Sequence, residues 1–164
     1  MKKLFLICVL ALMSFVLAAD PVEGYWLSID EKTGEITAGW QIYQKDNLLY
    51  GQILSAAGKP RDRVAEKCRE SYSNFPLAGK VNERTVINTP WIYGLKQNKP
   101  GEWSGGSIID PASGSQYQCK ITYHPADGER YKTDTLEMRG EIGFGIGRSQ
   151  FWQKSNRAAV AGLK

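Results

Sequence analysis

Residues 35–55 read EITAGWQIYQKDNLLYGQILS, and this stretch decides the fold. Every second residue from Ile36 to Ile42 is apolar, which places these side chains on one face of a strand because successive side chains alternate. The turn residues 45–47 follow, and residues 48–55 form the next predicted strand. The stretch therefore predicts a β-hairpin.

The same pattern of period two recurs along most of the chain. Clusters of Gly, Pro, Asn and Asp separate the runs, so nearly all connections have the length of a hairpin turn. The predicted strands cover residues 24–29, 35–44, 48–55, 91–95, 103–109, 116–123, 135–143 and 148–153. Consecutive antiparallel strands hide their edges by closing, so the sequence predicts an all-β, antiparallel up-and-down β-barrel of about eight strands. A two-sheet sandwich is the alternative, although it needs longer crossing connections.

Residues 56–88, after the third strand, lose this alternation. We expect one long irregular loop there, or a short helix in the charged stretch Arg61–Glu70. Connections of this length in compact domains are usually functional or disordered. The segment is therefore a candidate surface for binding another protein.

The first 19 residues have the pattern of a secretory signal peptide. Lys2 and Lys3 precede an apolar run from Leu4 to Leu17, and the small pair Ala18-Ala19 follows. The run is short for a membrane span, which needs about 20 apolar residues, although an uncleaved anchor is the alternative. We expect an exported protein, periplasmic or secreted, that is not an integral membrane protein after cleavage.

Removal of the leader leaves one domain of ordinary size. We expect a single β-barrel domain over residues 20–155 and a flexible C-terminal tail over 156–164. Loss of Lys2 and Lys3 lowers the formal net charge from +4 to +2, and the remaining basic residues are scattered among acids. This charge pattern excludes a surface that follows nucleic-acid phosphates.

Two cysteines, Cys68 and Cys119, remain outside the leader. In an oxidising compartment, a disulfide between them is the leading prediction. The alternative is a pair of free thiols, with Cys119 buried as a small apolar residue of its strand.

The residues that carry most enzyme chemistry do not gather in this sequence. His124 is the only histidine, and its surroundings match no metal motif, so we predict a surface position for it. Glu137 and Glu141 share a strand face with Arg139, but residues four apart on a strand lie about 13 Å from each other, too far for a glycosidase pair. We predict no catalytic residue, no metal site and no cofactor, and thus no enzyme.

Aromatic residues are the remaining functional signal, with five Trp and eight Tyr in the chain. Those of the predicted strands that we expect to line a pocket for a small hydrophobic or amphipathic ligand are Trp40, Trp91, Tyr93, Trp103, Tyr117 and Tyr123. The alternative is that these rings fill the barrel. The protein would then be a structural or interaction protein of the cell envelope that acts through its surface and residues 56–88.

Several segments together resemble a bacterial domain-of-unknown-function family, number 2147. They keep their order along the chain and are DPVEGYW at 20–26, LYG at 49–51, GGSIIDP at 105–111, Tyr117-x-Cys119-Lys120, and GRSQFW at 147–152. The resemblance implies a small exported bacterial protein of unestablished biochemical function. It also implies a compact barrel of lipocalin or fatty-acid-binding type.

A further resemblance is to the way lipocalins close the floor of their barrel. In those proteins a Trp near the start packs under a basic side chain near the end. Carried over to this chain, the pair is Trp26 and Arg148. Stacking of a guanidinium on an indole gains about 0.5–2 kcal/mol. The resemblance therefore implies a structural role for both residues.

Overall fold

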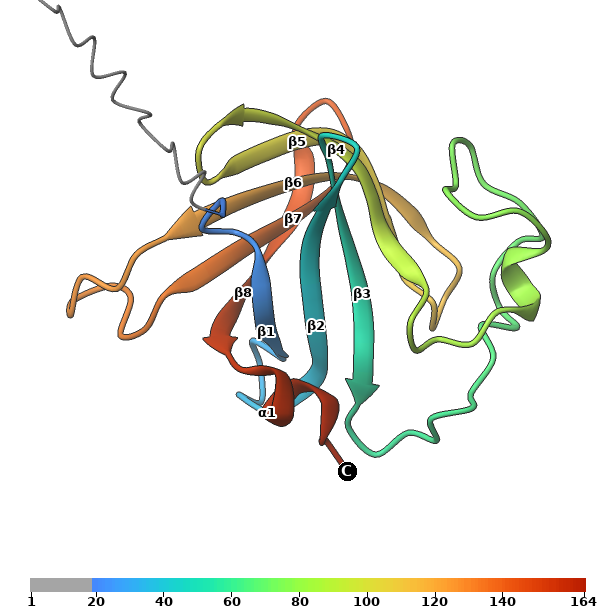
Figure 1. Cartoon of the computed structure of the whole chain (residues 1–164), viewed down its shortest axis with the longest axis horizontal. Coiled ribbons are helices and arrows are strands. Elements are labelled where there is room, and N and C mark those ends of the chain that lie inside the picture. Colours follow the sequence, from blue (N-terminus) through green and yellow to red (C-terminus); the bar gives the residue numbers. More distant parts are fainter. Residues whose placement is uncertain (1–18) are drawn as a thin grey trace, which may run out of the picture.

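The computed structural model describes residues 19–164, and the eight strands in this part of the chain form a closed antiparallel barrel (Figure 1). Each strand pairs with the next, and β8 returns to pair with β1. The strands are β1 (Gly24–Ile29), β2 (Ile36–Lys45), β3 (Leu48–Ala56), β4 (Pro90–Lys99), β5 (Glu102–Ile109), β6 (Gln116–His124), β7 (Thr135–Gly143) and β8 (Ile146–Ser155). The up-and-down barrel predicted from the sequence is confirmed. The predicted signal peptide lies almost entirely in residues 1–18, outside the described residues.

The hairpin expected at residues 35–55 is formed by β2 and β3. Its two turn residues, Asp46 and Asn47, have φ angles of 52° and 60°. Asp and Asn tolerate this left-handed conformation, which two-residue hairpin turns require. Within β2, Trp40 pairs with Trp26 of β1, and both side chains are buried.

One end of the barrel is packed solid. Fully buried side chains fill it from seven strands, β1 to β7, namely Trp26, Ile42, Leu49, Leu95, Trp103, Ile121 and Leu136. The N-terminal segment lies at this end, where the buried carboxylate of Asp20 accepts hydrogen bonds from Gln97 (2.7 Å) and the Gly101 amide (3.1 Å). We refer to it as the closed end.

The long connection between β3 and β4, residues 57–89, packs on the outside of the barrel. Ile92 faces the interior, since it pairs with Gly51 and Ile108, so its neighbours Trp91 and Tyr93 point outward. The ring of Phe75 lies 6.4 Å from Trp91 and 5.4 Å from Tyr93, centroid to centroid. The connection is thus a cover with its own apolar cluster.

Only one turn of 3-10 helix, Val81–Glu83, forms in this connection. The short helix considered for Arg61–Glu70 is absent, and those residues form turns and one isolated bridge at Val64. Because this segment covers Trp91 and Tyr93, its deletion would expose two large aromatic side chains.

The C-terminal residues form a short helix, α1 (Arg157–Ala161), where the sequence predicted a flexible tail. The Asn156 side chain caps its first turn by accepting a hydrogen bond from the Ala159 amide. Val160 is fully buried, and its carbonyl accepts a hydrogen bond from the Ser55 hydroxyl. A β-carbon at Gly39 would collide with that carbonyl, so glycine is what allows α1 to approach β2. Within residues 19–164, no helix is both long and apolar enough to cross a bilayer.

Candidate functional site

The end of the barrel opposite the closed end holds a cavity of about 850 Å³. Small-molecule sites in proteins measure about 300–1,000 Å³. Its deep wall is mostly apolar and comes from β2, β3, β5, β6, β7 and β8, through Ala38, Trp40, Ile53, Ile108, Tyr117, Met138, Gly140 and Trp152. The four connections that follow β1, β3, β5 and β7 surround its opening, which we call the mouth.

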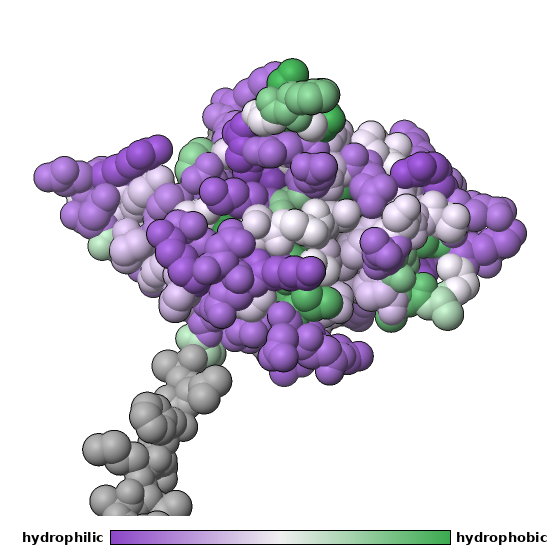
Figure 2. All heavy atoms as spheres, turned by 90° about the horizontal axis from the view of Figure 1, so that it is seen from above, coloured by the Kyte–Doolittle hydropathy of each residue, from purple (hydrophilic) through white to green (hydrophobic). Residues whose placement is uncertain are grey.

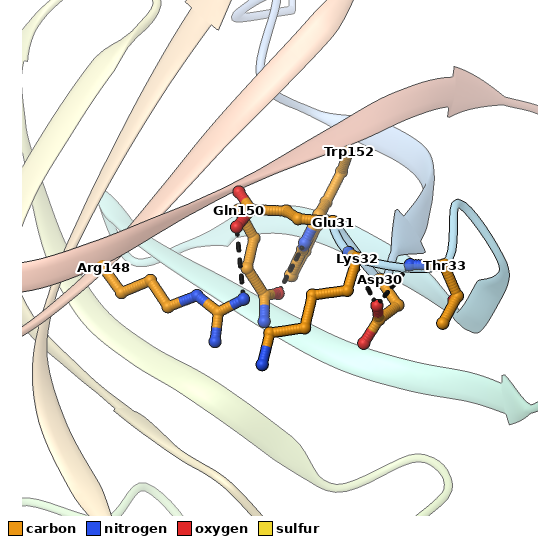
Figure 3. Close-up of polar contacts among 7 residues, drawn as sticks. All are labelled: Asp30, Glu31, Lys32, Thr33, Arg148, Gln150 and Trp152. Atoms are coloured by element: carbon orange, nitrogen blue, oxygen red, sulfur yellow. Dashed lines mark hydrogen bonds and ion pairs between the residues drawn. The ribbon is translucent and has the colours of Figure 1, made fainter.

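Two tryptophans form the flat part of this wall. The rings of Trp40 and Trp152 stack with centroids 4.7 Å apart and planes 25° apart. The Trp40 indole N–H donates to the hydroxyl of Ser28 (3.2 Å), and that of Trp152 donates to Oε1 of Gln150 (3.0 Å; Figure 3). Each ring is therefore fixed by a hydrogen bond and by its partner, and the wall exists before any ligand arrives.

Charged side chains lie at the mouth. Arg148 Nη2 is 3.2 Å from Oε2 of Glu31 in the β1–β2 turn (Figure 3). That turn is built on Asp30, whose carboxylate accepts the amides of Thr33 (2.9 Å) and Lys32 (2.8 Å). These two backbone hydrogen bonds lower the pKa of Asp30 below its ordinary value.

Lys59 and Arg63, from the connection after β3, also line the cavity, as do the carboxylates of Glu35 and Asp110. Asp110 is engaged in its own turn, because its carboxylate accepts the Ala112 amide and the Ser113 hydroxyl. The Asp110 carboxylate is thus hydrogen-bonded within its own turn. Lys59 and Arg63 add positive charge to the mouth.

The structure brings only two of the six predicted pocket residues to the cavity, Trp40 and Tyr117. Trp103 is buried at the closed end, and Tyr123 lies there too, edge-on to Trp26 with ring centroids 6.4 Å apart. Trp91 and Tyr93, as shown above, face outward under residues 57–89. These four residues therefore do not line the cavity.

Trp152, Gln150 and Met138 belong to the cavity wall but were not predicted. A signal for them was available, since Gln150 and Trp152 alternate with Arg148 along the last strand and share its face. The sequence did not show how deep each residue lies along the barrel axis, because alternation identifies only the face of the strand on which a side chain lies.

The pair proposed to close the floor, Trp26 and Arg148, does not form. Lys154 lies over Trp26 instead, with its Nζ 4.3 Å from the ring centroid, whereas Arg148 is at the mouth. β1 pairs with β8 through Trp26 and Lys154, which places Lys154 at the level of the indole. Burial lowers the pKa of the Lys154 ammonium.

The predicted disulfide is also absent, since Cys68 and Cys119 both carry free thiols. Cys119 points into the barrel from β6, where its neighbours Gly106 and Gly140 leave room for it, and Cys68 is in the connection after β3 beside Tyr72. Burial raises the pKa of both thiols, that of Cys119 most strongly.

Thiol labelling checks this arrangement. The thiolate is the reactive form, so buried thiols with raised pKa values should react slowly. The protein of residues 20–164 is treated with an aromatic disulfide reagent at neutral pH. We expect no fast-reacting thiol while the protein is folded. Two thiols should react after unfolding in denaturant without reductant. Two fast-reacting thiols in the folded state, or none after unfolding, would contradict the structure.

The titratable residues singled out in the sequence lie on the outer face of β6, β7 and β8. His124, at the end of β6, places Nε2 2.9 Å from Oε2 of Glu137, and the Ser149 hydroxyl donates to the other oxygen of Glu137 (2.7 Å). Burial raises the pKa of Glu137, but the hydrogen bonds from Ser149 and His124 outweigh it and lower the pKa overall.

In this cluster the carboxylate lies between the serine and the histidine. A nucleophilic triad needs the histidine in the middle, in contact with the serine. Glu141 is bound to Arg139 at 2.6 Å and is not paired with Glu137. No group of three or more His, Cys, Asp or Glu side chains suited to a metal ion occurs among residues 19–164.

Comparison with known proteins places this geometry in a family. Residues 24–154 match the family described as "Uncharacterized protein conserved in bacteria (DUF2147)". The chain belongs to DUF2147. The matched region of this DUF2147 protein holds all the strands except the last residue of β8, and it holds every residue that lines the cavity. No curated protein matches the chain.

One solved structure that this DUF2147 protein resembles is described as "Protein HP1028 from the human pathogen Helicobacter pylori belongs to the lipocalin family". The TM-score is 0.65 at 12% sequence identity, with 87% of this chain and 89% of the other covered. At this identity the likeness shows the fold alone, a lipocalin-like barrel, as the sequence resemblance implied.

Proposed function

We propose that this DUF2147 protein binds a small hydrophobic or amphipathic molecule inside its barrel. The observation that carries the proposal is the open cavity of about 850 Å³ with the stacked Trp40 and Trp152 in its wall. A barrel that used its aromatic residues only for stability would fill this space, as the closed end does. An apolar wall with few polar groups suits ligands that are held by their apolar area.

The polar groups support an amphipathic ligand with its head at the mouth. Arg148, Arg63 and Lys59 lie there, whereas the deep wall offers mainly apolar atoms. An anionic head group would compete with Glu31 for Arg148, whose side chain is 64% exposed. The deep wall would hold an alkyl or ring portion against the two indoles.

Titration with a fluorescent fatty acid tests the proposal directly. In residues 20–164 the fluorescence of Trp40 and Trp152 should be quenched as the probe enters, with saturation below about 100 μM and one site per chain. Absence of saturation by the fatty acid and by neutral lipophilic dyes would contradict ligand binding.

Substitution of Arg148 by alanine tests the place of the head group. Exposed ion pairs contribute up to about 1 kcal/mol, so we expect Arg148→Ala to weaken binding of a fatty acid by up to about fivefold. Binding of the fatty alcohol of equal chain length should change less than twofold. Equal weakening for both ligands would contradict an anionic head group at Arg148.

The same proposal covers two further points. We infer export from the leader pattern in residues 1–19, which a periplasmic or extracellular carrier needs. We also infer that the protein is not an enzyme, and the order of Ser149, Glu137 and His124 supports this. Export is checked by the N-terminal residue of the secreted protein, which should be Asp20.

A further inference from the structure

The mouth of the cavity carries an unusual share of the exposed apolar side chains. Of the large apolar residues that the structure leaves exposed, four lie there: Ile36 (40% exposed), Ile142 (71%), Phe144 (107%) and Ile146 (62%). Ile36, Ile142 and Ile146 also line the cavity, so the apolar wall continues outward to the surface. Seen from above, the surface is mostly hydrophilic; a compact apolar group protrudes at one edge, and smaller apolar areas lie elsewhere (Figure 2).

The residue at the tip of the β7–β8 hairpin is poorly suited to its backbone. Phe144 and Gly145 form a two-residue turn with φ angles of 50° and 74°. The two-residue turn between β2 and β3 also has positive φ at both positions, and there the residues are Asp46 (52°) and Asn47 (60°), types that this conformation favours. A bulky side chain at positive φ is strained, and a fully exposed one gains no burial in return. Phe144 therefore contributes nothing to the stability of the fold.

The charged groups around this tip are already paired. The Arg139 guanidinium binds the carboxylate of Glu141 (2.6 Å) and the carbonyl of Gly145 (2.8 Å). Such pairing lowers the cost of moving the hairpin out of water, because no isolated charge loses its hydration. The charges of Arg139 and Glu141 therefore oppose entry of the tip into an apolar phase less than two unpaired charges would.

We propose that the β7–β8 tip inserts into the surface of a lipid bilayer and holds the cavity mouth against the lipid. The proposal rests on the proposed function, because a ligand of this cavity is itself poorly soluble in water and the apolar rim joins the cavity to the bilayer interior. A second copy of the chain is a poor occupant. A stable interface buries about 800 Å² on each partner, and a single convex hairpin tip offers far less.

Phe144→Asn is the variant that tests the insertion. Asn accepts a left-handed φ, so the substitution should leave the melting temperature unchanged or raise it. Full burial of a Phe side chain corresponds to about tenfold or more in a partition constant, so binding to phosphatidylcholine vesicles should weaken at least about tenfold. The protein tested is residues 20–164, which hold every contact described above. Residues 1–19 are omitted because their apolar run would bind lipid by itself.

Leu77→Asn is the matched control. Leu77 is 39% exposed and does not line the cavity, so its substitution should change vesicle binding less than twofold. Wild-type binding should persist at high salt, because apolar insertion does not depend on screened charges. Binding that requires anionic lipid and is lost in salt would overturn the proposal.

Four further results test this inference, and the first three separate it from the proposed function. Without vesicles, the fatty-acid probe should bind the wild type and Phe144→Asn equally, which would support a role for the tip outside the cavity. Probe binding together with no vesicle binding would overturn the insertion and leave the proposed function intact. Vesicle binding with no probe binding would support the insertion and overturn the proposed function. Self-association lost in Phe144→Asn, without vesicle binding, would assign the tip to a second copy and overturn the proposal.

Discussion

Replacing Trp26 by alanine is expected to lower the free energy of unfolding by about 3–5 kcal/mol, the usual cost of removing a buried Trp. The side chain is 0% exposed at the closed end. Its indole N–H donates to the carbonyl of Val22 (2.9 Å), and Lys154 covers one of its faces. The substitution would leave a cavity where the barrel floor is now sealed, and the Val22 carbonyl would lose its partner.

Urea unfolding, followed by far-UV circular dichroism, measures this loss. Two control variants lie beside Trp26 at the closed end. Tyr25→Ala removes a half-buried ring on the opposite face of β1, with an expected loss of about 1 kcal/mol. Lys154→Gln removes only the cation, with an expected loss of about 0.5–1 kcal/mol. A loss for Trp26→Ala no larger than that for Tyr25→Ala would contradict its place in the floor.

Gly140→Leu is expected to abolish binding of the fatty-acid probe while the barrel stays folded. Gly140 lines the cavity from β7, and a β-carbon there would lie 3.4 Å from Cβ of Tyr117, an ordinary contact. The rest of a leucine side chain extends into the space that the ligand would occupy. We expect affinity to fall at least tenfold, with a change in unfolding free energy of no more than about 1–3 kcal/mol.

Gln118→Leu is the matched control for this variant. It adds the same side chain on the adjacent strand β6, at an exposed position on the outer face. Probe affinity should therefore stay within twofold of the wild type. Equal affinity of Gly140→Leu and the wild type would show that the probe binds elsewhere.

The barrel itself was predictable because one physical signal repeats in every strand. Side chains alternate across a strand, so half-buried strands show period two, and short turns force neighbouring strands to pair. The hairpin of residues 35–55 shows this most clearly, since its apolar face and its Asp46-Asn47 turn both point to the same structure. Local pattern and overall fold agree there.

The pocket was less predictable, and β4 shows why. Trp91 and Tyr93 were expected inside, but residues 57–89 cover the outer face of β4, so Pro90 to Tyr93 are all buried. Alternation identifies the core only where the other face meets water. A cover supplied by a distant, irregular segment removes that signal.

The expected pairing of Trp26 with Arg148 does not form, for a different reason. Both residues share one face of β8, so the sequence places either of them toward the interior. Which one reaches Trp26 depends on the register between β1 and β8 and on β8 extending to Ser155, two residues beyond its predicted end. Register between strands that are far apart in sequence is set by closure of the whole barrel.

The central claim is that the cavity is an open ligand site. A crystal structure of residues 20–164 grown with a bromine-labelled fatty acid would test it most directly, through the anomalous signal of the bromine. We expect the bromine inside the barrel, beside Trp40 and Trp152, with the carboxylate at the mouth near Arg148. A barrel in which the rings of Trp40, Tyr117 and Trp152 have closed over the space, with bromine only on the outer surface, would contradict the account.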